Sequence, residues 1–314
     1  MKKENMTEEL TAEYRRVAYY YYKAGLTQEE IANRMQMSRQ RVNRIVNACI
    51  ELGIVEITIK GLDKSNLQME TALEEKYQLR EVRIVDSVFD KNIYQELGAA
   101  GSAYLQTILK DNDVIGLTRG RTTSALVESI QGSENIENLV VTQLIGNGRE
   151  EENIGVDEMI YRFAEKFHAT PSVLYAPVIL KSNEVRDSLV QEPYFKEAYK
   201  IVKACTIAVV GIGTAHSQWK HMVSLYDSQD ELAYEWTKDV AGEVCTHFFN
   251  YEGEEVKPPF RDRIIAITLD DYMKIPVRIG VAGSLEKTEA IRAALKGKYI
   301  NVLITDLQTA EKLL

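Results

Sequence analysis

Hydrophobic residues recur at helical spacing three times within the first sixty residues of the chain. The first pattern spans residues 11–24, TAEYRRVAYYYYKA, and Gly25 follows it as a residue suited to end a helix. The second pattern begins after Thr27, which forms a capping box with Glu30, so a helix is expected to start at Gln28. The third pattern follows after a short break, and together they predict three helices connected by short turns.

The third pattern, MSRQRVNRIV and beyond, predicts a helix with one apolar face and one basic face. Ser38 is a favourable N-cap residue. Apolar residues then follow at i, i+3, i+4, i+7 and i+8, a spacing that places them on one stripe: Val42, Ile45, Val46, Cys49 and Ile50. Two short helices with a tight break between them, the second of them basic, are typical of a helix-turn-helix.

The exposed side of this helix has the residue types that recognise DNA. Arginine bonds guanine bidentately, Asn or Gln pairs with adenine, and a helix N-terminus favours a phosphate. The alternative to DNA recognition is a polar face that only contacts solvent. DNA recognition is favoured because the N-cap, the short break before the helix, the apolar spacing and the basic charge occur together here. We expect Arg39, Gln40, Asn43 and Arg44 at base edges and adjacent phosphates, and Arg41 at a phosphate alone. The full set predicted to bind DNA is Thr27, Gln28, Ser38, Arg39, Gln40, Arg41, Asn43 and Arg44.

Alternation of apolar and polar residues in 54–61, IVEITIKG, predicts a strand. This strand either forms a wing beside the helix-turn-helix, where Lys60 would meet a phosphate, or only packs the small domain.

Beyond residue 62 the pattern changes to strands in alternation with helices. The predicted strands are continuous apolar runs at 82–85, 113–118, 139–146, 172–178, 205–213, 277–283 and 299–306. The predicted helices include 63–79, 93–109, 122–130 and 156–167. Such strands imply a parallel sheet that is buried on both faces, an α/β architecture of the Rossmann-like type.

Glycine-rich polar segments follow several of these strands. They are TRGRTT (118–123), GNGR (146–149), GIGT (211–214) and AGS (282–284). Ligands of parallel sheets bind beyond the carboxyl ends of the strands, and hydroxyls and arginines at a helix N-terminus suit a phosphate. We therefore expect a small anionic ligand at this edge. Glu243 is a candidate for sugar hydroxyls, and Lys287 for a phosphate or hydroxyl. No Walker A motif or GxGxxG fingerprint is present, which disfavours a nucleotide.

The charge of the 314-residue chain changes sign at the place where the hydrophobic pattern changes, near residue 60. Residues 1–60 carry a net charge of +2, whereas the whole chain carries −9. No apolar run approaches the roughly 20 residues that cross a bilayer, and MKKENMTEEL lacks an apolar signal segment. Three scattered cysteines favour reduced thiols, and four histidines without ligand spacing disfavour a metal. We expect a cytoplasmic protein without membrane contact, cofactor or metal.

The sequence resembles the SorC family of bacterial sugar-responsive transcriptional regulators over nearly its whole length. The resemblance rests on YYYKAGLTQEEIANRMQMSRQRVNRIV, GIVEI, AVVGIGT, AGEVCTHFFNYEG and VRIGVAGSLEKTEAIRAALKGKYINVLITD. It implies a winged DNA-binding module and an effector domain related in fold to sugar-phosphate isomerases and deaminases. It also implies assembly into dimers or tetramers, and phosphorylated sugars or similar small phosphates as effectors.

Carried over by position, the resemblance implies a phosphate at the loop from Thr118 to Thr122. The full set of residues predicted to bind the effector is Thr118, Arg119, Gly120, Arg121, Thr122, Gly146, Asn147, Gly148, Gly211, Thr214, Glu243 and Lys287. Two departures leave the effector's identity open: the family often has an aspartate where Glu243 stands, and a double glycine in place of the sequence GNG.

These observations predict a DNA-binding domain at 1–60 and an effector-binding, oligomerising domain at 61–314. The predicted protein is a regulator of a carbohydrate-utilisation operon that binds double-stranded operator DNA and a sugar or phosphorylated sugar. A sugar-phosphate isomerase or deaminase with an accessory DNA-binding module is one alternative, disfavoured because no acid–base set is evident beyond Glu243. A pure oligomerisation scaffold is the other.

Overall fold

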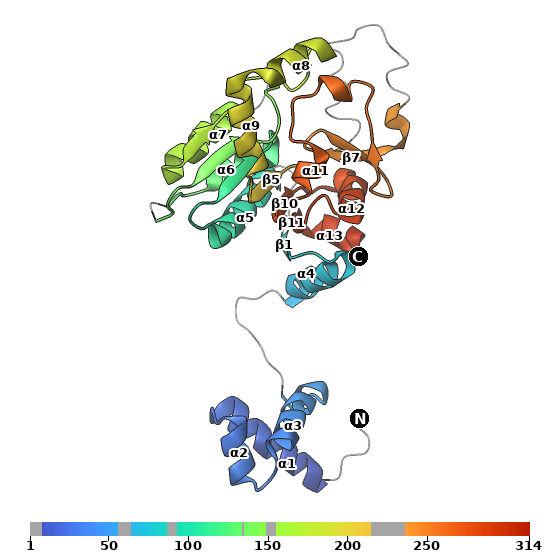
Figure 1. The fold of residues 1–314 in the computed structure, drawn as a ribbon. Coiled ribbons are helices and arrows are strands. Elements are labelled where there is room, and N and C mark those ends of the chain that lie inside the picture. Colours follow the sequence, from blue (N-terminus) through green and yellow to red (C-terminus); the bar gives the residue numbers. More distant parts are fainter. Residues whose placement is uncertain (1–7, 56–63, 87–92, 134, 149–154, 215–235) are drawn as a thin grey trace. The chain divides into compact units, whose positions relative to one another are not determined.

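The computed structural model describes residues 8–55, 64–86, 93–133, 135–148, 155–214 and 236–314. The chain forms two compact units, Met1–Leu62 and Asp63–Leu314 (Figure 1). The predicted boundary between residues 60 and 61, most of the strand expected at 54–61 and Lys60 lie outside the described residues, so those expectations stay predictions.

The first unit consists of helices whose starts are set by side-chain caps. Helix α1 (Glu8–Ala18) continues as a π-helical turn, η2 (Tyr19–Lys23), and α2 (Gln28–Arg34) and α3 (Arg39–Glu51) follow. Thr27 and Glu30 form the predicted capping box, and the Ser38 side chain accepts from the backbone N–H of Arg41. The three predicted helices are therefore confirmed.

The apolar stripe of α3 packs against α1 and α2. Val42, Ile45, Val46 and Cys49 are buried with Val17 and Ile31 in one cluster. The inclusion of Ile50 in this buried stripe was wrong, because its side chain is 48% exposed. Eight residues at about 100° each turn Ile50 roughly 80° away from Val42, beyond the face that the other two helices cover.

The second unit is built on a seven-stranded parallel sheet with the order β1-β11-β10-β5-β2-β3-β4 (Figure 1). This confirms the predicted α/β class. The strands are β1 (Glu81–Val85), β2 (Val114–Leu117), β3 (Val140–Gln143), β4 (Thr170–Ser172), β5 (Ile207–Val210), β10 (Val277–Val281) and β11 (Val302–Asp306).

Apolar cores lie on both faces of this sheet. Alternate residues of β5 separate into the two cores, with Ile207 and Val209 in one and Ala208 and Val210 in the other. The first core includes residues of α5 (Ile93–Ile108), α6 (Arg121–Ser129) and α7 (Val156–Phe167). The second includes residues of α4 (Lys64–Tyr77), α9 (Pro193–Lys203), α12 (Thr288–Lys296) and α13 (Leu307–Leu313).

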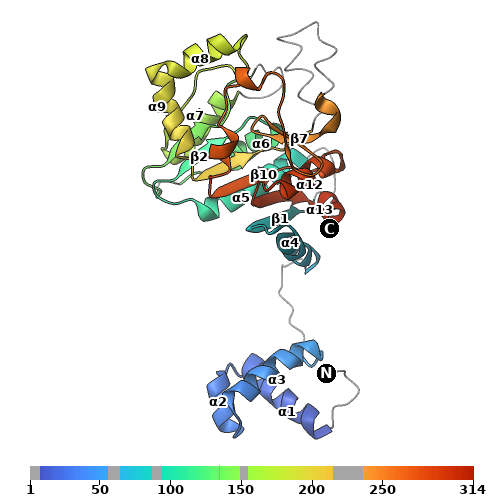
Figure 2. The ribbon, with the colours of Figure 1, turned by 45° about the vertical axis from the view of Figure 1, so that its right-hand side comes forward.

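A four-stranded antiparallel sheet, β6-β7-β8-β9, was not predicted. Figure 2 shows its strand β7 beside α12, with which it is in contact. Its strands are short: β6 (Gly213–Thr214), β7 (Val240–Val244), β8 (His247–Asn250) and β9 (Glu255–Val256). Further elements that the sequence pattern did not single out are α8 (Asn183–Gln191), α9, η5 (Arg261–Arg263) and α11 (Leu269–Tyr272).

Three predicted strands were clearly too long. The strand expected at 139–146 is β3, which ends at Gln143. The strand expected at 172–178 is the short β4, and beyond it Pro177 and Ile179 form only isolated bridges. The apolar run at 205–213 divides into β5 and β6, because the chain leaves the parallel sheet at Gly211 and Ile212. Burial of these segments in the core, and not strand pairing, accounts for their apolar composition.

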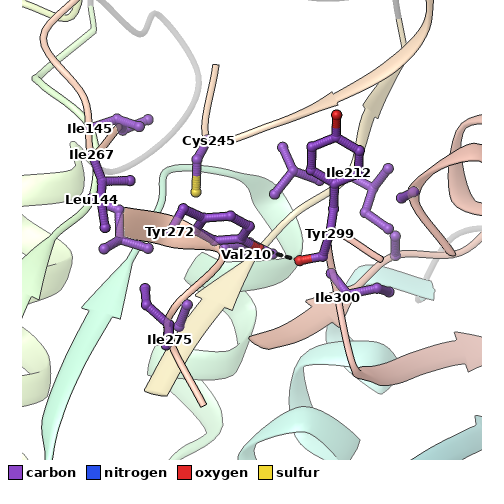
Figure 3. Packing of buried hydrophobic residues seen from close by; sticks show 14 of the residues in the cluster. Leu144, Ile145, Val210, Ile212, Cys245, Ile267, Tyr272, Ile275, Tyr299 and Ile300 are labelled. Atoms are coloured by element: carbon purple, nitrogen blue, oxygen red, sulfur yellow. Dashed lines mark hydrogen bonds between the residues drawn. The ribbon is translucent and has the colours of Figure 1, made fainter. Parts of the chain in front are cut away.

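Tyr272 is fully buried in the second core. Figure 3 shows its ring among Leu144, Val210 and Cys245. Its hydroxyl donates to the backbone carbonyl of Tyr299 at 2.8 Å, so the polar end of this side chain is satisfied inside the core. This packing joins α11 and the turn of the β7–β8 hairpin to the ends of the parallel strands.

Candidate functional site

A cavity lies at the carboxyl ends of β2 and β5, the edge at which parallel sheets bind ligands. Its empty volume, including its open mouth, is about 880 Å³. The lining residues come from the loops after the strands, the first turns of α5 and α6, the β7–β8 hairpin and the turn that ends at Lys287: Tyr94, Thr118, Arg119, Gly120, Arg121, Thr122, Ile145, Gly211, Ile212, Gly213, Thr214, Glu243, Cys245, Thr246, Phe248 and Lys287.

The cavity brings together the predicted effector residues of four separate segments. Thr118 to Thr122 follow β2, Gly211 and Thr214 follow β5, Glu243 lies on β7, and Lys287 lies in the 3₁₀ turn η6 (Leu285–Lys287). Residues up to 169 positions apart in sequence thus line one cavity. Whether they bind an effector stays a prediction.

The loop Gly146–Gly148 does not line the cavity. Asn147 is held by backbone bonds instead, because its N–H donates to Ala176 and its carbonyl accepts from Val178. Gly148 affects the cavity through Arg119, which lines it. A Cβ at Gly148 would lie 2.3 Å from Nη1 of Arg119, too close for both to fit. The absence of a side chain at Gly148 therefore leaves room for the Arg119 guanidinium.

The loop after β2 leads directly into the N-terminus of α6. Gly120 has a φ of +150°, a backbone conformation that favours glycine, and α6 begins at the next residue. The Thr122 hydroxyl donates to the carbonyl of Val281 at 2.8 Å, which fixes the helix start against β10. The first N–H groups of a helix have no partner within it, so this end of α6 can donate to an anion.

The carboxylate of Glu243 faces this loop from the antiparallel sheet. It accepts a hydrogen bond from the backbone N–H of Thr246 at 3.0 Å. Gly213 gives it space, because a Cβ there would lie 2.5 Å from its Oε1. Burial raises the pKa of Glu243, against the Thr246 hydrogen bond and the charges of Arg119 and Lys287, which lower it.

Cations outnumber carboxylates in the cavity. Arg119, Arg121 and Lys287 line it together with Glu243, the one acidic residue among the described residues of the lining. Burial lowers the pKa of Lys287, the nearby charge of Arg121 lowers it further, and Glu243 raises it. Two cations that disfavour each other's charge are better accommodated when an anion lies between them.

Sequence reasoning missed several residues of the cavity wall. Tyr94 on α5 supports Arg121, whose guanidinium carbon lies 4.1 Å from the centroid of the Tyr94 ring. Cys245 and Thr246 form the two-residue turn between β7 and β8, and both have positive φ, 52° and 67°. The block AGEVCTHFFNYEG had marked this region, but without glycine at the turn its hairpin was not recognisable.

The segment AGS at 282–284 has a supporting role and does not line the cavity. The N–H of Ser284, a residue with φ of +97°, donates to the buried Asp306 carboxylate at 2.8 Å. The same carboxylate accepts from the Thr309 hydroxyl. These bonds hold the turn that carries Lys287.

A change of pH tests the environment of Glu243. The ordinary pKa of a glutamate carboxyl is 4.5, and folding raises the pKa of Glu243. At a pH between these two pKa values, the carboxyl binds more protons in the folded chain than in the unfolded chain. Its contribution to the free energy of unfolding is full below the ordinary pKa and is lost as pH rises through the folded pKa. We expect the melting temperature of wild type to fall relative to Glu243→Gln as pH rises from 4.5 towards neutrality.

The exposed Glu158→Gln variant, on α7, is the matched control for that experiment. A difference in melting temperature between wild type and Glu243→Gln that stays constant with pH would show that burial does not raise this pKa.

The predicted DNA-binding residues of α3 point away from the buried stripe. Arg39, Gln40, Arg41, Asn43 and Arg44 are all exposed. Arg41 forms an ion pair with Glu13 of α1 at 3.0 Å, so this arginine also ties two helices together.

The caps and α2 add polar contacts near this surface. Thr27 and Ser38 use their side-chain oxygens to cap α2 and α3. Gln28 Nε2 donates to Asn43 Oδ1 at 3.1 Å, across the two helices.

The described residues contain neither a membrane span nor a grouped set of metal ligands. No helix among them is both long and apolar enough to span a bilayer. Within the same residues, no three His, Cys, Asp or Glu side chains are grouped closely enough to hold a metal ion.

Comparison with known proteins identifies the family. The family described as "Putative sugar-binding domain" matches residues 64–314, and "Sigma-70, region 4" matches residues 8–51. The sorbitol operon regulator of Klebsiella pneumoniae is 27% identical and covers 95% of this chain and 96% of its own. The deoxyribonucleoside regulator of Bacillus subtilis is 29% identical, with 94% and 95% covered.

A solved structure has the same fold over nearly the whole chain. The full-length sorbitol operon regulator SorC of Klebsiella pneumoniae gives a TM-score of 0.75 at 27% identity and covers 98% of this chain and 99% of its own. These relatives are named as regulators. With a sugar-binding domain over residues 64–314 and a helix-turn-helix before it, this chain belongs to the SorC family of DNA-binding, sugar-responsive transcriptional regulators.

Proposed function

We propose that this regulator binds operator DNA through α3 and is switched by a phosphorylated sugar bound in the cavity beyond β2 and β5. The observation that carries the proposal is the composition of the cavity. Three cations, several hydroxyls and one carboxylate line it, beside the N-terminus of α6. A sugar phosphate offers the matching groups, an anion and a set of hydroxyls.

Different groups of the cavity lining suit different parts of such a ligand. Charged hydrogen bonds to phosphate are the strongest that this lining can make, and Arg121 with the α6 N-terminus supplies them. Glu243 accepts hydrogen bonds from sugar hydroxyls when it is ionised. The charges of both Arg121 and Glu243 act on the pKa of Lys287, which can serve as a second cation for the phosphate or as a donor to a hydroxyl.

We further propose that the ligand is bound without turnover. Proton transfer on a sugar needs a positioned acid and base. Among the described residues of the lining, Glu243 is the one carboxylate, and no histidine accompanies it. His247 is close in sequence, but its ring bonds the carbonyl of Ile267 at 3.0 Å and does not line the cavity.

DNA recognition follows the helix-turn-helix geometry. In a dimer, two copies of α3 would read half-sites about one helical turn apart, or a multiple of that distance. The effector changes operator binding only if it binds one arrangement of the dimer better than another. We propose such a dimer or tetramer in the cytoplasm.

Substitution of Gly211 tests the position of the ligand without a change of charge. Among the described residues, an added Cβ would come near Thr122 Oγ1 alone, at 3.8 Å, so the folded chain tolerates alanine. The methyl group would narrow the cavity and overpack the complex with the ligand. Such overpacking should reduce the free energy of binding by about 1–3 kcal/mol. We expect Gly211→Ala to bind the effector about 5- to 150-fold more weakly with an unchanged melting temperature, measured by calorimetry and thermal unfolding. An effector affinity equal to that of wild type would show that the ligand does not bind beside Gly211.

A thermal-shift screen of sugars and sugar phosphates tests the class of ligand. A specific ligand raises the melting temperature by mass action. We expect phosphorylated sugars to give larger shifts than the matching free sugars. Equal shifts for both would contradict a phosphate site, and turnover of any hit at high protein concentration would contradict binding without catalysis.

A further inference from the structure

The hydrogen bond between Gln28 and Asn43 joins the two helices of the helix-turn-helix on their polar side. Gln28 is the first residue of α2, and Asn43 is the fifth residue of α3. Gln28 Nε2 lies 3.1 Å from Asn43 Oδ1. The Asn43 side chain is exposed on the face that carries Arg39, Gln40 and Arg44.

An exposed asparagine amide can turn over and exchange its oxygen and nitrogen at little cost. The two orientations present opposite orders of donor and acceptor to a base edge, whereas an adenine edge offers one fixed order, an N7 acceptor beside an N6 donor. Discrimination by Asn43 therefore depends on what holds its amide in one orientation before and during contact with DNA.

Gln28 supplies that constraint. Its Nε2 carries two hydrogens, and one of them is used by Oδ1 of Asn43. The other can donate to a phosphate oxygen of DNA that docks against this face. Phosphate oxygens only accept, so a phosphate keeps the nitrogen of Gln28 in place. The Asn43 oxygen then stays towards Gln28 and keeps its second lone pair, beside Nδ2, for a base.

We propose that Gln28 is a positioning residue that fixes the amide of Asn43, so that base preference at one operator position depends on a side chain of the neighbouring helix. The inference rests on the proposed docking of α3 in the major groove. It predicts adenine at the position read by Asn43. It also makes Gln28 a link between a phosphate contact, which carries no sequence information, and a base contact, which does.

Base preference is the measurement that separates positioning from a structural link. The full chain is used to select operators from a randomised DNA library, and affinities for the four bases at each position are then measured. The position read by Asn43 is the one whose preference disappears in Asn43→Ala. In wild type we expect adenine to be preferred there by about 5- to 150-fold.

Two variants of Gln28 give opposite expectations. Gln28→Ala should lose most of the preference at that position and at no other, and Gln28→Ala/Asn43→Ala should match Asn43→Ala alone. Gln28→Glu offers only acceptors, so it should turn the Asn43 amide over and replace adenine as the preferred base. Asn33→Asp, which adds the same charge at an exposed position of α2, should lower affinity for all sequences and leave the preference unchanged.

Each other outcome overturns the inference. If Gln28→Ala and Gln28→Glu keep the wild-type preference while binding all sequences more weakly, Gln28 contacts a phosphate alone. If Gln28→Ala lowers the melting temperature and leaves preference intact, the bond is only structural. If Asn43→Ala changes no position, Asn43 does not read a base. If wild type prefers no sequence at all, the proposed docking of α3 fails as well.

Discussion

Arg121→Ala is expected to weaken binding of a phosphorylated effector about 10- to 150-fold while operator binding without effector is unchanged. Arg121 lines the cavity at the first position of α6, and the Tyr94 ring lies 4.1 Å from its guanidinium carbon. Hydrogen bonds to a charged group contribute about 1.5–3 kcal/mol, which corresponds to that range of affinity. Calorimetry with the sugar phosphate found by the thermal-shift screen measures the loss.

The matched control is Arg162→Ala on α7, which removes an exposed arginine that pairs with Glu158 of its own helix. This variant should bind the effector like wild type. The free sugar provides a second comparison, because Arg121→Ala should affect its binding much less than that of the phosphate. Equal effector affinity of wild type and Arg121→Ala would exclude Arg121 from the phosphate site.

Arg39→Ala is expected to cost about 1–3 kcal/mol at one operator base pair and to relax specificity there. Arg39 is exposed at the first position of α3, the end that reaches base edges in a helix-turn-helix. Arg41→Ala should instead weaken binding to all sequences and reduce the salt dependence by about one counterion. Operator variants titrated at several salt concentrations distinguish the two outcomes.

Arg83→Ala, an exposed arginine of β1 in the second unit, is the control for loss of one positive charge. Arg41 needs a further check, because its bond to Glu13 links α1 and α3. The Arg41 side chain is exposed but that of Glu13 is only 22% exposed, so thermal unfolding is measured to establish that this variant remains folded. Wild-type operator binding by both the Arg39 and Arg41 variants would show that α3 is not the DNA-reading helix.

Features with a local cause were predictable from the sequence. The starts of α2 and α3 follow from the side chains of Thr27 and Ser38, which cap the helices whatever lies around them. The parallel sheet follows from continuous apolar strands alternating with helices. Because such strands end at one edge, segments as distant as Thr118 and Lys287 were expected in one cavity, and they line one.

Features that depend on tertiary packing were not predictable. Nothing local distinguishes Ile50 from the buried residues of its stripe, and only the extent of α1 and α2 decides its exposure. Asn147 follows an apolar strand like the cavity residues, but its backbone pairs with Ala176 and Val178. Tyr94 carries no motif, and its role arises because α5 brings it under Arg121.

The central claim is that a ligand in the cavity changes the operator affinity of this chain. The most direct measurement titrates labelled operator DNA with the full protein, with and without the sugar phosphate found by the screen. We predict that the ligand shifts the operator dissociation constant at least about tenfold for wild type, a coupling of about 1.4 kcal/mol, and that the shift disappears in Arg121→Ala. A ligand that binds wild type in the cavity and leaves its operator affinity unchanged would contradict the account.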